Sequence, residues 1–533
     1  MSKDTFLKGA LILTVAGIVV KLIGSVNRIL LSRLLGGEGI GLYQMAYPIY
    51  LLALSISSAG IPVAISIIVA EKVALGDWRG ANRVFRLSFT MLAATGAVFS
   101  LLLWFGAPWL IEHGFVRDPR AYYAIAALAP AIFFVTVLSS YRGYFQGLQM
   151  MTPTAISQII EQLFRVVTMI LLAYLLLPYG LEYAAAGASF GACPGALAGL
   201  LVLVYFYWRK RPALQEQMDG QPPGRQEPGL SIINRIVRLA LPVSLANIML
   251  PVTATLDLAI VPQRLEVAGY TVAQSTELFG YLTGMAVPLV NMATILTASL
   301  AASLVPAVSE AFTLRNHQHV LQRTATAMRI SNLITIPSFV GMCLLAKPIS
   351  LMLYGTPNAD TSIAILAVGI FLLGIHQVTT GVLQGLGRTA VPVINMVISA
   401  SVKMVLSWTL TAVPALGIQG AAWATNADFG VAALLNMFFV YRYVGFAIDM
   451  KDTLRTAFAA AVMGGAVLLT YHEAMAIIIN NTLSTLAAIV VGGGVYGMVL
   501  LVTGGVTQRD IERIPRVGSL LVKILQSLRL LRS

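Results

Sequence analysis

The sequence predicts an all-α polytopic membrane protein, and three observations support this. Of its 533 residues, 58% are hydrophobic and only 11% are charged, whereas an ordinary soluble protein carries about 25% charged residues. The hydrophobic residues gather in runs long enough to cross a bilayer, which takes about 20 residues of helix. The 46 glycines suit such helices, because small residues let neighbouring backbones approach closely. Most of the exterior is therefore expected to face lipid.

About fourteen segments have the length and composition of membrane-spanning helices. The N-terminal segment is too long for the core of a signal peptide, so it is counted as the first span. The expected spans lie at residues 8–34, 42–70, 86–106, 121–140, 152–177, 184–207, 235–262, 278–307, 328–347, 361–381, 390–412, 418–441, 454–470 and 484–503.

The placement of basic residues predicts the orientation. Cytosolic loops of membrane proteins carry an excess of Lys and Arg, and most of the 35 basic residues fall on one side once the N-terminus is placed inside. The outer loops then hold only Arg33, Arg117, Arg120, Arg264 and Lys347. Both termini are therefore expected in the cytosol. The net charge of +13 fits anionic lipid headgroups rather than nucleic acid, because the basic residues sit in short loops.

An internal repeat divides the chain. The segment Tyr144–Leu148 is matched by Val382–Leu386, and the buried cations Arg165 and Lys403 are separated by the same offset. Six helices per half is an even number, so the halves share one orientation, as in the parallel repeats of some secondary transporters. The expected parts are a first lobe at 1–207, a cytosolic linker at 208–234, a second lobe at 235–443, two further helices at 444–506 and an amphipathic cytosolic tail at 507–533.

Charged residues inside the apolar segments are the candidates for function, because each costs about 2.5–3.5 kcal/mol on insertion scales. Lys21 and Arg28 share one helical face without an acidic neighbour, which favours an anion-binding cavity. Glu161 and Arg165 form an i,i+4 pair that either serves a site or simply neutralises itself. Asn27, Gln158 and Gln162 are candidate hydrogen-bond donors to sugars, or else contacts between helices. The second half offers Asp257, Lys403 and Asp428 as candidates for ion coupling, and Tyr43, Tyr47 and Tyr50 are expected to be interfacial anchors.

Enzyme signatures do not stand out. No P-loop motif occurs, and His472-Glu473 is not followed by the second histidine of a zinc protease motif. Cys193 and Cys343 lie inside apolar segments without metal-ligand spacing and are expected to be buried thiols. We therefore expect no enzymatic activity, no cofactor and no metal site.

Several segments together resemble the stage V sporulation protein B family. They are Phe6–Gly9, Lys21–Arg28, Gly60–Ser66, Arg142–Gly147, Ser157–Gln162 and Leu177–Gly187. The resemblance runs through essentially the whole chain and is densest in the first six helices. That family is part of the superfamily that also holds the MATE drug exporters and the MurJ lipid II flippases. Lys21 matches a basic residue of the MurJ first helix. The next basic residue of that helix falls where Asn27 stands, one step before Arg28.

The resemblance implies a fold and a function. The fold would be two six-helix bundles in a V with two extra C-terminal helices. The substrate would be an undecaprenyl-pyrophosphate-linked saccharide, flipped across the bacterial cytoplasmic membrane by alternating access during cell-wall or spore cortex synthesis. The expected partners are this lipid-linked substrate, membrane lipids, a coupling ion (Na+ or H+) and cell-wall synthesis enzymes. Two alternatives stay open, a MATE-like exporter of organic cations and a membrane scaffold that transports nothing.

Overall fold

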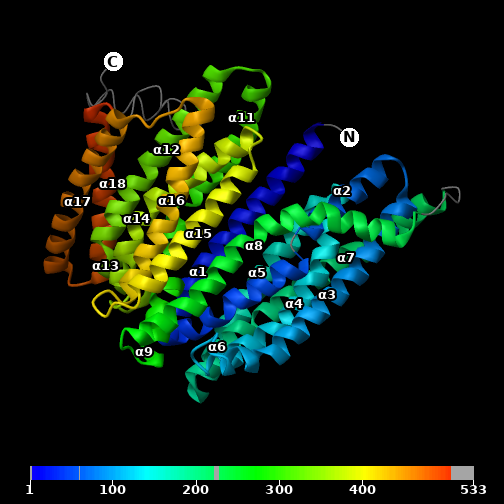
Figure 1. The fold of residues 1–533 in the computed structure, drawn as a ribbon, viewed down its shortest axis with the longest axis horizontal. Coiled ribbons are helices and arrows are strands. Elements are labelled where there is room, and N and C mark those ends of the chain that lie inside the picture. The colour runs from blue at the N-terminus through cyan, green and yellow to red at the C-terminus, as the bar shows by residue number, and fades with distance from the viewer. Residues whose placement is uncertain (1–2, 59, 221–226, 506–533) are drawn as a thin grey trace. The chain divides into compact units, whose positions relative to one another are not determined.

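The computed structural model describes residues 3–58, 60–220 and 227–505, and this part of the chain is built from helices without a β-strand (Figure 1). The contacts divide the protein into two compact units, Met1–Gly280 (unit 1) and Tyr281–Ser533 (unit 2). The all-α class expected from the sequence is therefore confirmed. Each unit is described by itself below.

Unit 1 contains long helices joined by short turns, so that consecutive helices pack side by side. The helices are α1 (Lys3–Ser58), α2 (Ile61–Ala74), α3 (Trp78–Glu112), α4 (Ala121–Gly147), α5 (Met151–Leu176), the 3₁₀ turn Leu177–Tyr179, α6 (Leu181–Phe190), α7 (Ala192–Asp219), α8 (Gly229–Val267) and α9 (Val272–Phe279). Their buried core includes Ile65, Phe85, Tyr144 and Ile236, from α2, α3, α4 and α8.

Unit 2 begins with a π-helical segment and then repeats the pattern of long helices. Its elements are the π-helix Gly280–Ala286, α10 (Val287–Ala293), α11 (Ile295–Thr313), α12 (His317–Leu344), α13 (Ala346–Tyr354), α14 (Asp360–Gly385), α15 (Ala390–Leu410), α16 (Ile418–Val444), α17 (Met450–Ile478) and α18 (Asn481–Thr503). Its core includes Val308, Met328, Val382 and Val440, from α11, α12, α14 and α16.

Twelve helical runs in the described residues are long and apolar enough to cross a membrane, and the protein is a multi-pass membrane protein. The expected count of fourteen is not confirmed. The first two expected spans form one run, Val15–Ala74, because helix continues through the bend at Gly36. The expected span at 418–441 forms α16 but is not among the twelve, because Asn426, Asp428 and Asn436 interrupt its apolar sequence.

The internal repeat appears as matching glycine contacts within each unit. A Cβ on Gly147 of α4 would lie 2.6 Å from Val69 Cβ of α2. A Cβ on Gly385 of α14 would lie 2.7 Å from Val308 Cβ of α11. Such distances are too short for a real side chain, so both helix pairs need glycine at this crossing. The two halves therefore use the same packing at equivalent positions of the repeat.

The turns that follow also correspond. Asp77 caps α3 by accepting a hydrogen bond from Gly80 N at 2.7 Å, and Asn316 caps α12 by accepting one from His319 N at 3.1 Å. Side-chain oxygens at this position satisfy backbone N–H groups that the helix leaves unpaired. The repeat thus extends from helix packing to helix capping.

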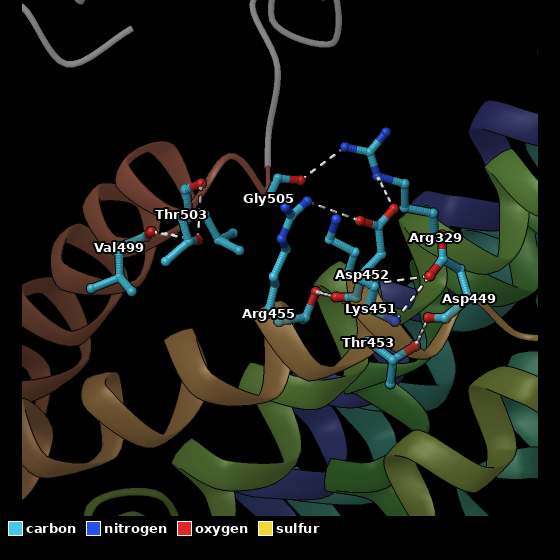
Figure 2. A network of polar contacts seen from close by, with 11 residues as sticks. Arg329, Asp449, Lys451, Asp452, Thr453, Arg455, Val499, Thr503 and Gly505 are labelled. Carbon is cyan, nitrogen blue, oxygen red and sulfur yellow. Dashed lines mark hydrogen bonds and ion pairs between the residues drawn. The ribbon is translucent and has the colours of Figure 1, made fainter. Parts of the chain in front are cut away.

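The last two long helices form a pair of their own. In unit 2, α17 and α18 lie side by side, and α17 also packs on α12 (Figure 1). Figure 2 shows the polar contacts that hold the start of α17: Arg329 Nε of α12 lies 3.6 Å from Asp452 Oδ2, and Arg455 Nη1 donates to Asp452 Oδ1 at 3.5 Å. Arg329 Nη2 also donates to the carbonyl of Gly505 at 2.8 Å. Ion pairs therefore fasten the extra helices to the second half.

The boundaries between the expected parts remain predictions. The linker expected at 208–234 is helical at both ends, because α7 runs to Asp219 and α8 begins at Gly229. The amphipathic tail expected at 507–533 lies outside the described residues.

Candidate functional site

The first helix turns sharply and brings two distant polar residues together. In a straight helix, residues 28 and 44 would lie about 24 Å apart. The backbone of α1 leaves helical geometry at Gly36, whose φ of 68° lies in the left-handed region that favours glycine. Arg28 Nη1 donates a hydrogen bond to Gln44 Oε1 at 2.9 Å. The bend therefore places Arg28 against the second half of its own helix.

Aromatic rings complete the surroundings of Arg28. Its Cζ lies 5.9 Å from the ring centre of Tyr43 and 5.3 Å from that of Tyr47, within cation–π range. The ring of Tyr47 lies 5.5 Å from that of Tyr43 and 5.9 Å from that of Tyr50. Tyr43 and Tyr50 are only 5% and 1% exposed. The interfacial anchors expected here are therefore wrong for these two residues, which pack inside unit 1 near a charge.

Glu161 joins two arginines. Its Oε2 accepts a hydrogen bond from Arg142 Nη2 at 2.8 Å, and its Oε1 accepts one from Arg165 Nη2 at 2.6 Å. Ser157 Oγ accepts from Nε and Nη2 of Arg142, both at 3.2 Å. All three ion-paired side chains are at most 18% exposed. The i,i+4 pair expected on α5 is thus present, and Arg142 of α4 adds a third charge.

Two glycines on α7 let this charged face of α5 pack closely. A Cβ on Gly195 would lie 2.8 Å from Arg165 Cβ, and a Cβ on Gly199 would lie 3.0 Å from Glu161 Cβ. Small residues at such crossings allow helices to approach in a membrane. The backbone of α7 therefore shields the ion pairs from one side.

Arg28 and Arg165 lie near the same tyrosine. Tyr43 lies within electrostatic range of both guanidinium groups. Arg142 and Arg165 share the single carboxylate of Glu161, and Arg28 has neutral partners, so these four side chains carry a net positive charge. Arg165 Nε is buried and has no hydrogen-bond partner among the described residues. A partly desolvated site with excess positive charge and a spare donor suits an anion with oxygen acceptors.

The other candidate residues of the first half differ in their burial and in the contacts that they make. Asn27 is 6% exposed, and its Nδ2 donates to a methionine sulfur of α5 at 3.4 Å. Gln162 Nε2 reaches α1, 3.3 Å from where a Cβ on Gly24 would lie. Gln158 is half-buried on the same helix. Lys21 is exposed, and no ion pair joins it to the residues that the structure describes.

The candidates of the second half do not form one set. Lys403 of α15 is 6% exposed. Asp428 of α16 accepts a hydrogen bond from Ser399 Oγ of α15 at 2.6 Å. Asp257 lies on α8, which belongs to unit 1. Lys403 and Asp428 are thus the candidates on the polar helices of unit 2.

A second charged cluster ties α8 and α9 to the rest of unit 1. Arg117 donates to both carboxylate oxygens of Glu266, at 2.9 and 2.6 Å, and this hydrogen bonding raises the pKa of Arg117 above its ordinary value. Asp118, 1% exposed, accepts from Arg120 Nη2 and from Thr276 Oγ1, both at 2.8 Å. Every charge in this cluster has a partner of opposite sign, so we interpret the cluster as structural.

Sequence reasoning did not select Arg142 or Gln44. Arg142 stands near the end of an apolar segment, where a basic residue usually marks the membrane boundary. Gln44 reaches Arg28 only because of the bend at Gly36. The available signal for Arg142 was its position within the segment Arg142–Gly147, which resembles the family.

Two family models match the chain. The model described as "Polysaccharide biosynthesis protein" covers residues 6–312, and the model described as "MatE" covers residues 282–409. Stage V sporulation protein B of Bacillus subtilis (strain 168) is 32% identical over 525 residues, which are 98% of this chain and 100% of that protein. Lipid II flippase MurJ of the same organism is 28% identical over 480 residues, 86% of this chain and 87% of that protein.

Solved structures show the same fold at low sequence identity. An inward-facing MATE family multidrug resistance transporter gives a TM-score of 0.68 at 16% identity. The match covers 80% of this chain and 94% of the transporter chain. The lipid II flippase MurJ in an inward closed conformation gives a TM-score of 0.68 at 15% identity. The match covers 92% of this chain and 98% of the MurJ chain. These relatives are transport proteins rather than enzymes. The chain belongs to the polysaccharide biosynthesis protein family, within the MATE- and MurJ-like superfamily.

Proposed function

We propose that this protein is a flippase that moves an undecaprenyl-pyrophosphate-linked saccharide from the inner to the outer leaflet of the cytoplasmic membrane. The observation that carries the proposal is a group of partly buried cations in unit 1: Arg142 and Arg165 share the single carboxylate of Glu161, while Arg28 is held by the neutral side chains of Gln44 and Tyr47. A pyrophosphate linkage is an anion rich in acceptor oxygens, and guanidinium groups bind such oxygens two at a time. The family membership supports the same substrate class.

Each side chain has a role in this proposal. Arg28 and Arg165 bind the pyrophosphate, and Lys21, exposed on the same helix as Arg28, attracts it. Glu161 holds the guanidinium groups of α4 and α5 while the site is empty. A phosphate oxygen then takes the place of a carboxylate oxygen, so the buried arginines keep an anionic partner throughout.

The sugar and the lipid tail require different surroundings. Gln158, Gln162 and Asn27 offer amide groups to sugar hydroxyls near the charged face of α5. The prenyl tail stays in lipid, in keeping with the large apolar side chains exposed on the surface, such as Phe105 and Val490, each 73% exposed. In this arrangement the pyrophosphate contacts the arginines, the sugar contacts the amide side chains and the prenyl tail remains in the lipid.

The setting follows from the chain's charge pattern and its relatives. Most basic residues fall on one side, which favours a cytosolic location for both termini. Alternating access would be driven by the membrane potential or a coupling ion. The similarity to stage V sporulation protein B favours a role in spore cortex or cell-wall synthesis, next to the enzymes that make and use the substrate.

The test measures flipping by the full-length protein in liposomes, with a fluorescent undecaprenyl-pyrophosphate saccharide as probe. Arg28→Ala is expected to lower the rate at least about 30-fold, since losing one charged hydrogen-bond partner costs about 2 kcal/mol or more. The matched control is Lys210→Ala, an exposed basic residue of α7, which should keep the wild-type rate. Equal rates for Arg28→Ala and the control would reject the assigned site. Drug resistance without flipping would favour a MATE-like exporter instead.

A further inference from the structure

A chain of side-chain hydrogen bonds crosses three helices of unit 2. Asn395 Nδ2 of α15 donates to Asn436 Oδ1 of α16 at 2.8 Å. Asn436 Nδ2 donates in turn to Thr380 Oγ1 at 2.9 Å and lies 3.3 Å from His376 Nδ1, both on α14. Asn436 is 0% exposed and Asn395 is 2% exposed. The chain therefore runs from the buried amides on α15 and α16 to the half-buried side chains of His376 and Thr380 on α14.

The direction of this chain depends on the protonation of His376. The nitrogen of an asparagine amide only donates, so His376 Nδ1 is the acceptor and the ring is neutral in this arrangement. When Nδ1 carries a proton, its N–H group and the N–H group of the Asn436 amide face each other, and both are donors. The Asn436 amide must then turn so that its oxygen faces the imidazolium and its nitrogen faces Asn395, whose amide turns in the same way. One proton therefore reverses both amides.

An acidic group lies beside the face of α15 that holds Asn395. Asn395, Ser399 and Lys403 follow one another at intervals of four residues and so share one face of α15. Ser399 Oγ donates to Asp428 Oδ1 at 2.6 Å. The face of α15 that holds Asn395 thus also contacts a carboxylate on a second helix.

The other charged side chains on the helices around α14 are engaged elsewhere. On α12, Arg323 Nη1 donates to Glu310 Oε2 of α11 at 3.4 Å, and Arg329 pairs with Asp452. Exposed side chains account for His317 and His319 of α12, Lys347 of α13 and Arg442 of α16. Asp360 at the start of α14 accepts from Thr361 N, and α10 has no ionisable residue. In the described part of unit 2, one histidine, one aspartate and one lysine therefore make up the ionisable groups of this polar face.

We infer that His376 is a proton-binding site that couples proton entry to a rearrangement of α14, α15 and α16. Histidine is the side chain whose ordinary pKa lies in the physiological range. A reversed hydrogen-bond chain changes how three packed helices hold one another, which is how a local charge biases a two-state element. The inference rests on the proposed function for its role in transport, since it names the proton as the coupling ion. Proton binding itself is measured separately.

The first experiment observes the proton directly. The full-length protein, labelled with nitrogen-15 in its five histidines, is titrated in lipid bilayers from about pH 5 to 8, the range in which histidine changes charge. His376→Gln identifies the His376 signal by its disappearance. We expect this signal to pass from a neutral ring to an imidazolium within the range. A signal that keeps one protonation state throughout overturns the inference.

The second experiment connects the proton to transport at a clamped membrane potential. A rate governed by one proton changes about tenfold per pH unit on one side of the pKa of its group. We expect this dependence in the wild type and a flat profile in His376→Gln. His472→Gln, the same change at an exposed histidine of α17, should keep the wild-type profile. A wild-type profile in His376→Gln overturns the coupling role.

A third variant separates proton binding from its transmission. Asn395→Leu leaves His376 in place but removes the far end of the chain. Its histidine signal should still titrate, while its transport rate should no longer follow pH. A transport rate that still follows pH would overturn the transmission through Asn395. If the wild type flips no substrate at any pH while His376 titrates, the proposed function fails and the proton site stands.

Discussion

The same helix face carries an acid and a base in one half of the protein and a single base with two neutral polar groups in the other. The face consists of Ser157, Glu161 and Arg165 on α5 and, at the equivalent positions of the repeat, of Asn395, Ser399 and Lys403 on α15. The neighbouring helix contributes Arg142 in the first half and Thr380, at the same offset, in the second. Packing is conserved between the halves, whereas the chemistry is not.

The position of the acid explains the difference. In unit 1 the carboxylate of Glu161 lies on the same helix face as Arg165 and also holds Arg142 of α4. In unit 2 the matching position is Ser399, and the carboxylate comes from α16 as Asp428. Unit 1 is therefore left with excess cations, which suit an anionic substrate. Unit 2 has a half-buried histidine within hydrogen-bond distance of Asn436, which suits a proton. The two proposals thus assign different roles to the two halves.

The largest expected effect on this difference between the halves comes from removing Arg165, the cation on the charged face of α5. Arg165→Met leaves Glu161 with Arg142 alone and deletes a partner of a buried ion pair, which costs about 3–5 kcal/mol. We expect the free energy of unfolding of the full-length protein to fall by about 3 kcal/mol, since Arg142 still compensates in part. The measurement is equilibrium unfolding in mixed detergent micelles.

A double-mutant cycle isolates the interaction. Arg165→Met combined with Glu161→Gln removes both charges, so the double variant should lose less stability than the sum of the two single changes. Additive losses would mean that the pair contributes nothing, and the charged face would then be explained by substrate binding alone.

A change on α15 at Ser399, the position equivalent to Glu161, is expected to be milder. Ser399→Ala removes the hydroxyl that donates to Asp428 at 2.6 Å. Side-chain hydrogen bonds inside membrane proteins contribute about 0.6 kcal/mol on average and at most about 1.7 kcal/mol. We therefore expect a loss of about 1 kcal/mol by the same unfolding measurement. A loss as large as that of Arg165→Met would show that the two faces do not differ in the proposed way.

The fold was largely predictable from sequence because its signals are local or periodic. Hydrophobic runs mark helices, and the fixed offset between Gly147 and Gly385 marks a repeated packing contact. The pair Glu161–Arg165 was predictable because i,i+4 neighbours always share a helix face. These features depend on the helix alone and not on how helices are arranged.

The parts that sequence missed depend on tertiary structure. Arg142 reaches Glu161 from another helix, and Gln44 reaches Arg28 only across the bend at Gly36. Tyr43 was misplaced at the membrane interface because aromatic residues near the end of an apolar run usually anchor there. A single left-handed glycine turned that segment inward, and hydropathy does not register such a bend.

The smallest expected difference between the halves is a response to pH at the turn after the second helix of each repeat. Lys72 Nζ of unit 1 lies 3.2 Å from Glu227 Oε2 and 3.3 Å from Asp77 Oδ2. The hydrogen bond from Lys72 lowers the pKa of Glu227 below its ordinary value. A lowered carboxylate pKa gives stability that is present at neutral pH and is lost as the pH falls through it. The matching cap of unit 2, Asn316, does not titrate.

Lys72→Met therefore provides the test. Because these carboxylates are partly exposed, the pair contributes at most about 1 kcal/mol. Acidification from about pH 6 to below 4, the range in which ordinary carboxylates protonate, should destabilise the wild type slightly more than the variant. Hydrogen exchange at the backbone of α2 and at the start of α8 reports the difference locally, and α12 of unit 2 serves as the internal reference. If the wild type and Lys72→Met respond equally to acid at these helices, the carboxylate of Glu227 gains no stability from Lys72 in the folded state. Glu227 would then not distinguish the two halves.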